Sequence, residues 1–347
     1  MHLEDAWNPH FEALEAGCLI TPEALLAEGQ CQHVNKRQQR PPDFENLPTL
    51  FDLEKVLRAN RPGRATGHDP FTSELYHRHH AALAEHAYPL LLKTWVWGEE
   101  PIQFKGGPLA LIPKRPQPQE VQHFRGILLL PTLAKGFHAL MRKEIINLLQ
   151  HQRLPGQLGG FRQQEVLFGS QALRVLGRAA HQAHLSMGVL FVDLSTAFHC
   201  LIREMVVGIS DIRKFNYVLD TLQNARCPEA SLHIGRTLPC LLQELNAPPH
   251  LIRLLQSVHD STWMMINDKE FIRTHKGTRP GSPVADAIFH YIMFDVSRTL
   301  QTFLREQGHA DFIQQMVGME VDMVIWSDDL AIPVRPSPTG PIGFCPP

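Results

Sequence analysis

Three carboxylates stand at the ends of two apolar segments, where they could share one chemistry. Asp193 closes the run MGVLFVDL (187–194), and Asp328 and Asp329 lie within EVDMVIWSDDLAIPV (320–334). The first run fits a buried strand, and the second fits two strands with a tight turn at the Asp pair. Taken singly, each position is more easily a strand end or a turn residue. Taken together, they offer the oxygen ligands that Mg²⁺ prefers, and two metals held by carboxylates can promote phosphoryl transfer.

Apolar spacing indicates the elements that must position these carboxylates. An amphipathic helix is expected from Leu50 to the turn signal Pro62-Gly63. The other expected elements are helices at about 71–97, 132–150 and 284–304, and a β-hairpin built from 108–114 and 123–130. Residues 1–46 are weakly patterned, and we interpret them as an N-terminal extension or linker. A Pro-rich tail occupies 336–347.

Composition sets only broad limits on function. The chain has 347 residues, enough for two subdomains with a real core. A formal net charge of -2 argues against a general polyanion binder, because proteins that bind duplexes normally carry an excess of Lys and Arg. A local basic groove remains open, since many basic residues lie in the first half of the chain: Arg61, Arg64, Lys105, Lys114, Arg115, Arg125, Lys135, Arg142 and Lys143.

Cysteine spacing and the lengths of apolar runs indicate the cellular compartment, and the histidines offer a possible metal site to weigh. The six cysteines form no CxxC pair, so neither a zinc site nor a disulfide framework is indicated, and we expect reduced thiols in an intracellular protein, in nucleus or cytoplasm. No signal pattern is present, and no apolar run is long enough to cross a bilayer, so no membrane partner is expected. The densest histidine group is interpreted as a solvated helix face: His77, His79, His80 and His86.

The segments around the carboxylates resemble a known family. FVDLSTAFH (191–199) resembles polymerase motif A of reverse transcriptases, most of all those of the non-LTR (LINE-type) retrotransposons. IWSDDLAI (325–332) resembles motif C, and KGTRPGSPVADAIFHYIM (276–293) resembles motif B. Four upstream segments also resemble the family's: RATGHDPFTSEL (64–75), PLALIPK (108–114), FRGILLL (124–130) and LGGFRQQ (158–164). A single motif is weak support, but these follow the family's own order over roughly 47–334.

This resemblance implies an RNA-directed DNA polymerase of retroelement origin. It would transfer a nucleotide from a dNTP to a DNA primer 3′-hydroxyl on an RNA template, using two Mg²⁺ ions or Mn²⁺ in their place. The implied fold is α+β, with right-hand polymerase fingers, an antiparallel palm sheet and the thumb missing. The implied domains are fingers over 47–185 and palm, with some fingers helices, over 186–335.

The resemblance also implies metal ligands. Asp193, Asp328 and Asp329 would be catalytic and bind the metals, with the Leu194 backbone carbonyl as an extra ligand. Without the resemblance these positions would remain strand ends and a turn.

Residues for the nucleotide are implied in the same way. Phe198 falls at the position of the steric gate that excludes a ribose 2′-hydroxyl, although a core phenylalanine is the plainer interpretation. Lys114 and Arg125 would grip the triphosphate. Gly281 would allow close backbone approach to nucleotide or template, and Arg279 would touch phosphate.

Two alternatives stay open: the missing thumb favours the first, the second shares the carboxylate chemistry, and the departures from the family pattern concern the detail of the nucleotide pocket. One is a truncated, catalytically silent retroelement remnant with at most weak nucleic-acid binding. The other is a viral RNA-dependent RNA polymerase palm, which Phe198 and the upstream segments disfavour. The departures are His199, Pro280, Ala285, Asp286, Trp326, Ser327 and Gly126.

Overall fold

The computed structural model divides the chain into two compact units. It describes residues 6–39, 42–161, 163–194, 196–209, 212–224, 240–266, 270–306, 318 and 323–334. The first unit comprises Met1–Leu148 and Phe198–Ile288, and the second comprises Leu149–Ala197 and Phe289–Pro347. Helices account for 54% of the structure and strands for 14%. The chain is therefore a mixed α/β protein.

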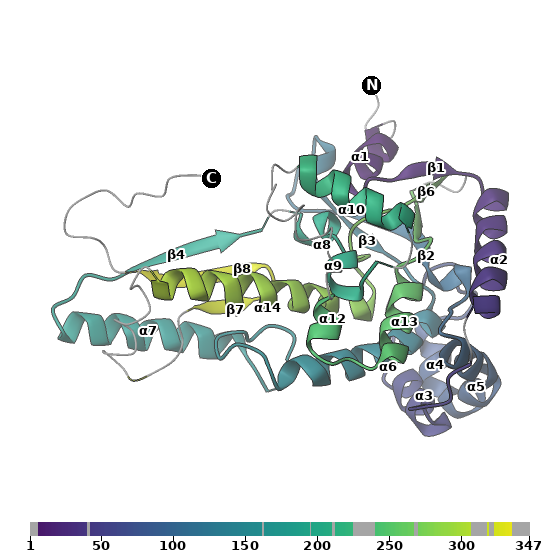
Figure 1. Ribbon diagram of the computed structural model, residues 1–347, viewed down its shortest axis with the longest axis horizontal. Helices are drawn as coiled ribbons and strands as arrows, with labels where there is room; N and C mark the ends of the chain where they lie inside the picture. Colours follow the sequence, from purple (N-terminus) through teal and green to yellow (C-terminus); the bar gives the residue numbers. More distant parts are fainter. Residues whose placement is uncertain are drawn as a thin grey trace. The chain divides into compact units, whose positions relative to one another are not determined.

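Helices of 4 to 19 residues make up most of the first unit (Figure 1). Before the second unit begins, they are α1 (Trp7–Leu14), α2 (Pro22–Gln39), α3 (Leu50–Arg58), α4 (Ser73–Arg78), α5 (His80–Trp97) and α6 (Thr132–Gln150), with 3₁₀ turns at Ile102–Phe104 and Val121–His123. After it, they are α8 (Ala197–Cys200), α9 (Glu204–Val207), α10 (Ile212–Asn224), α12 (Leu241–Glu244) and α13 (Pro249–Val258). The helices predicted from Leu50, over 71–97 and over 132–150 are present, although α4 and α5 divide the second of them.

A helix-capping pair explains why α3 begins where it does. The Thr49 hydroxyl accepts the Asp52 backbone N–H at 3.1 Å, and the Asp52 carboxylate accepts the Thr49 backbone N–H at 3.0 Å. These bonds provide acceptors for backbone N–H groups that the first turn of a helix would otherwise leave without a hydrogen-bond partner. Leu53 and Leu57 then bury the apolar face that the sequence pattern predicted.

A five-stranded mixed sheet lies in the first unit. Its strands are β1 (Cys18–Ile20), β2 (Gly106–Pro113), β3 (Phe124–Leu128), β5 (Trp263–Met265) and β6 (Phe271–Arg273), in the order β1-β6-β5-β2-β3. The predicted hairpin of β2 and β3 is antiparallel, with Leu109 opposite Leu128. The parallel pairing of β2 with β5 was not predicted from sequence, because β5 has only three residues.

The N-terminal region contributes to this core. Trp7 and Phe11 of α1 are buried in a cluster with Leu109, Leu128 and Ile272. β1 pairs with β6 along the sheet edge. The interpretation of 1–46 as an extension or linker missed these elements, because α1 and β1 are short and α2, although 18 residues long, has no apolar stripe in its sequence.

The second unit contains a three-stranded antiparallel sheet. Its strands are β4 (Gly188–Asp193), β7 (Val324–Trp326) and β8 (Asp329–Val334), in the order β4-β8-β7. The unit also holds α7 (Val166–Gln182) and most of α14 (Pro283–Glu306), which begins in the first unit (Figure 1). The segments that carry Asp193 and the Asp328-Asp329 pair therefore lie in one antiparallel sheet. Across the described residues, no helix is both long enough and apolar enough to cross a membrane.

Candidate functional site

Strand register places two of the candidate carboxylates face to face. In the antiparallel pair of β4 and β8, Asp193 stands directly opposite Asp329, at the end of the ladder. Directly opposed residues have Cβ atoms about 4.5–5.5 Å apart and project to the same face of the sheet. Both side chains are exposed. The two carboxylates therefore share one open patch of sheet surface.

The third carboxylate lies in the turn beside this pair. Trp326 pairs with Asp329, so Ser327 and Asp328 alone form the loop between β7 and β8. Ser327 has a φ of 58°, a left-handed conformation that costs an L-residue about 1–2 kcal/mol. The strain is stored next to the two aspartates, and such strain persists only where neighbouring structure holds it.

The segment LGGF supplies that support. The backbone N–H of Leu158 donates to the Ile325 carbonyl at 3.0 Å, and the Ile325 N–H donates to the Gly156 carbonyl at 2.9 Å. Gly159 lies so close to the turn that a Cβ there would stand 2.5 Å from the Ser327 backbone nitrogen. A glycine is required at this approach, and it fixes the turn that carries Asp328.

Helix α14 holds the same segment from another side. Gln157 donates from Nε2 to the His290 carbonyl at 2.9 Å. Gly160 has a φ of 76°, and a Cβ at this position would overlap the His290 imidazole. Phe161 also contacts that ring, with centroids 5.5 Å apart. The LGGF segment is thus anchored to both β7 and α14.

The donor set at the sheet end fits a hard divalent cation. Asp193, Asp328 and Asp329 show no side-chain hydrogen bond or ion pair with any described residue. Like charges directly opposed across strands are destabilising, and oxygen-only donors are what Mg²⁺ prefers. Within the residues that the structure describes, however, no three His, Cys, Asp or Glu side chains gather into a metal-binding group. The register brings Asp193 and Asp329 together, while Asp328 is adjacent only through the turn. Leu194 is exposed just past the end of β4.

The candidate phosphate-binding residues lie on one face of the β2–β3 hairpin. Arg125 is opposite Ile112, and the Lys114 backbone N–H extends the ladder to the His123 carbonyl at 2.8 Å. Because strand side chains alternate between faces, Lys114 and Arg125 are diagonal neighbours on the same face. Both are exposed. Leu109 and Leu128 project to the opposite face, into the core with α1.

Phe198 is held by the start of the motif B segment. The Thr278 backbone N–H donates to the Phe198 carbonyl at 2.8 Å. Gly277, with a φ of 82°, approaches the His199 carbonyl so closely that a Cβ would lie 2.9 Å from it. The Phe198 side chain is half-buried, so its ring remains partly open to solvent.

Gly281 approaches protein backbone. Its φ is 113°, and a Cβ there would overlap the Leu128 carbonyl oxygen. The neighbouring Pro280 carbonyl accepts the Leu128 N–H at 2.7 Å. The structure thus shows Gly281 against the end of β3, while its expected approach to nucleotide or template stays a prediction.

Arg279 is buried, with 3% of its surface exposed. Its Nη1 donates to the Phe104 carbonyl at 3.5 Å. Burial lowers the pKa of Arg279 to about 10, against the opposing effect of Glu100. A buried guanidinium is not accessible to phosphate, so we leave Arg279 out of the phosphate contacts proposed below.

His199 forms a buried pair that the sequence did not indicate. Its Nδ1 lies 2.5 Å from Glu15 Oε1, at the end of α1. Arg203 lies close by in the chain and donates to Thr262 Oγ1 at 2.8 Å and to the Thr274 carbonyl at 3.1 Å. No sequence signal links Glu15 to His199, because their contact depends on tertiary packing alone.

Asp286 forms an ion pair with Arg142 of α6. Arg142 donates to it from Nε and Nη2, the latter at 2.7 Å.

No protein-family model matches this sequence, and no curated protein matches it either.

Proposed function

We propose that the chain is an RNA-directed DNA polymerase of retroelement origin. The observation that carries the proposal is the register that sets Asp193 opposite Asp329, with Asp328 in the adjoining two-residue turn. The order of the motif-like segments along the sequence supports the same reaction class. The substrates would be a dNTP and a DNA primer paired to an RNA template.

The carboxylates would hold two Mg²⁺ ions, or Mn²⁺ in their place. Two facing carboxylates on one exposed sheet face, with no ion-pair partner among the described residues, are unfavourable by themselves, and cations would relieve that repulsion. When bound, the ions would assist removal of the primer hydroxyl proton and stabilise the leaving pyrophosphate. The Leu194 carbonyl would complete the ligand set. Ser327 and Gly159 would keep Asp328 at its place in the turn.

Residues of the first unit would bind the nucleotide. Lys114 and Arg125, exposed on one hairpin face, would donate charge-assisted hydrogen bonds to triphosphate oxygens. The half-buried Phe198 ring would exclude a ribose 2′-hydroxyl and so select deoxynucleotides. Gly281 would act indirectly, by allowing the motif B turn to pack on β3.

Primer extension tests the proposal. Purified protein, poly(rA) annealed to oligo(dT), Mg²⁺ or Mn²⁺ and labelled dTTP should give labelled product. Asp328→Asn should abolish that product while the protein stays folded. Well-folded wild-type protein that incorporates no label with either metal would refute polymerase activity for this chain and favour a silent remnant.

A further inference from the structure

One face of α7 carries a row of basic side chains that the proposed function does not use. Arg174, Arg178 and His181 are spaced at i, i+4 and i+7, and all three are exposed. Residues at this spacing lie along one side of a helix. Leu176 and Ala180 are buried on the other side. We call the three basic residues the α7 basic face.

Helix α7 offers these cations no compensation. Its sequence, VLFGSQALRVLGRAAHQ, contains no acidic residue. Neither arginine forms an ion pair with a carboxylate among the residues that the structure describes. The helix dipole favours a cation only in the last turn, which accounts for His181 but not for Arg174 or Arg178.

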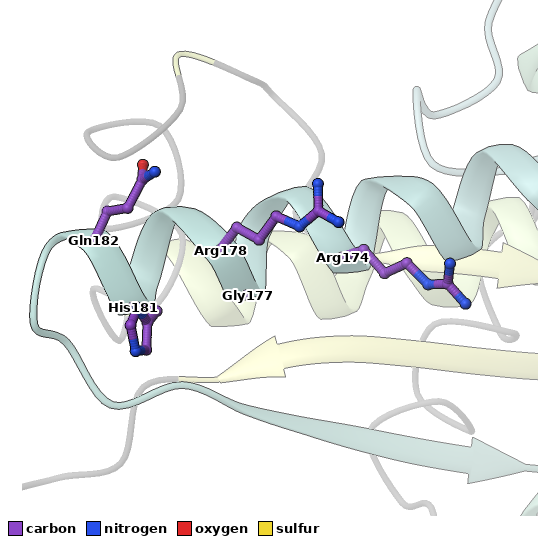
Figure 2. A pocket seen from close by; sticks show the side chains of 5 residues that line it. All are labelled: Arg174, Gly177, Arg178, His181 and Gln182. Atoms are coloured by element: carbon purple, nitrogen blue, oxygen red, sulfur yellow. The ribbon is translucent and has the colours of Figure 1, made fainter.

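A surface hollow of about 430 Å³ lies against this face, lined by Arg174, Gly177, Arg178, His181 and Gln182 (Figure 2). Gly177 contributes no side chain, although a Cβ there would meet only Met187 Cε, at 3.7 Å. Glycine inside a helix costs about 0.5–1 kcal/mol relative to alanine, and here it leaves room between the two arginines. Figure 2 shows both arginine side chains extending along the helix toward its N-terminal end.

We propose that the α7 basic face binds the phosphodiester backbone of single-stranded RNA. At 1.5 Å of rise per residue, Arg174 and Arg178 are about 6 Å apart along the helix axis, a spacing that allows contacts to neighbouring phosphates of one strand. Guanidinium groups donate paired hydrogen bonds to phosphate oxygens. The charge complementarity is local, since the whole chain has a net charge of -2. The choice of RNA rests on the proposed function, which requires an RNA template.

Equilibrium binding of RNA by the full chain tests this inference. Fluorescence anisotropy of a short labelled oligouridylate would be measured at several KCl concentrations, in EDTA and without nucleotide. The test variant is Arg174→Gln/Arg178→Gln. The matched control is Arg58→Gln/Arg78→Gln, which removes two exposed arginines of α3 and α4 and gives the same change in net charge. Circular dichroism would establish that both variants are folded.

The test variant should bind RNA about tenfold more weakly than wild type, while the control should not. Its plot of log affinity against log salt should be shallower by about 1.4, at 0.7 for each lost single-strand phosphate contact. Equal affinity and slope in wild type and test variant, an equal loss in the control, or no RNA binding by wild type would each overturn the inference. Binding to phosphatidylserine vesicles through the same arginines, without binding to RNA, would also overturn it.

The assay separates this inference from the polymerase proposal. The binding assay contains neither metal nor dNTP, so its result does not depend on catalysis. The inference about α7 can therefore fail in this assay while wild type still extends a primer. Conversely, RNA binding that depends on Arg174 and Arg178 would stand even if no nucleotide were ever incorporated.

Discussion

Asp193 and Asp329 are directly opposed across the last rung of the β4–β8 ladder. Strand alternation sends both side chains to the same face of the sheet, where both are exposed. A fold selected only for stability has no reason to place two like charges there, because like charges in that relationship oppose strand pairing. The cation site proposed above would relieve this repulsion, and the next experiments test that proposal.

Neutralising one member of the pair should stabilise the metal-free protein. Asp329→Asn removes the cross-strand repulsion, and the free energy of unfolding should rise by about 0.2–1 kcal/mol in EDTA. Added Mg²⁺ should raise the melting temperature of wild type, because a ligand of the folded state stabilises it. The same addition should have a smaller effect on Asp329→Asn. Thermal unfolding with and without Mg²⁺ measures both effects.

Asp220→Asn is the matched control for that experiment. It removes one exposed carboxylate from α10, so its response to Mg²⁺ should equal that of wild type. If Asp329→Asn destabilises the metal-free protein and responds to Mg²⁺ as wild type does, the facing pair is not a cation site.

Gly159→Ala should disturb the turn that carries Asp328. The new Cβ would stand 2.5 Å from the Ser327 nitrogen, so LGGF or the turn must shift. We expect a loss of about 1–3 kcal/mol of stability, as in other overpacked positions. Gly136→Ala in α6 is the control, because its Cβ would meet Leu57 and Val56 at ordinary distances of 3.5 and 3.6 Å. Urea unfolding that shows the two variants equally stable would contradict the close approach.

Lys114→Gln/Arg125→Gln should weaken nucleotide binding. Both side chains are exposed, so the fold should be unchanged, while KM for dNTP should rise by roughly tenfold or more as charge-assisted contacts are lost. Steady-state primer extension over a range of dTTP concentrations gives KM. Lys143→Gln, which removes an exposed charge from α6, serves as the control. An unchanged KM in the double variant would remove the hairpin from the nucleotide site.

Much of the fold could be predicted from contiguous patterns. The stripe from Leu50, the helix over 132–150 and the runs that became β4 and β8 each carry a long periodic or apolar signal. An antiparallel sheet for these strands was implied by the family resemblance. β1, β5 and β6 could not be predicted in this way. Each has three residues, and their places in the sheet depend on pairing with distant segments.

The candidate site was predictable in part. Asp193 and Asp329 stood out because acidic residues interrupt apolar runs, and the structure places them opposite each other. The burial of Arg279 did not follow from its sequence neighbourhood, which is rich in turn residues. Gly159 also carried no separate signal, because its role depends on the Ser327 backbone lying against it.

Stability should decrease on acidification partly through His275. Burial, with Arg273, Arg203 and Lys214 nearby, lowers the pKa of His275 from 6.5 to about 4. Between these values the unfolded chain binds a proton at this position and the folded chain does not, so the free energy of unfolding falls as pH falls from about 6.5 to about 4. His275→Gln should make this decline shallower, as measured by urea unfolding across that range.

The exposed His79 provides the comparison for that experiment. His79→Gln makes the same substitution at a side chain that stays exposed in the folded protein. Parallel profiles for His275→Gln and wild type would show that His275 does not contribute to acid sensitivity.

Metal-dependent primer extension by matched Asp variants tests the central claim most directly. Wild type should extend oligo(dT) on poly(rA) with Mg²⁺ or Mn²⁺ and should stop in EDTA. Asp193→Asn and Asp329→Asn should each abolish extension, because either change removes one of the two facing carboxylates. Asp220→Asn should extend as wild type does. Extension that persists in both Asp193→Asn and Asp329→Asn would contradict the account, since the facing carboxylates would then not be the catalytic centre.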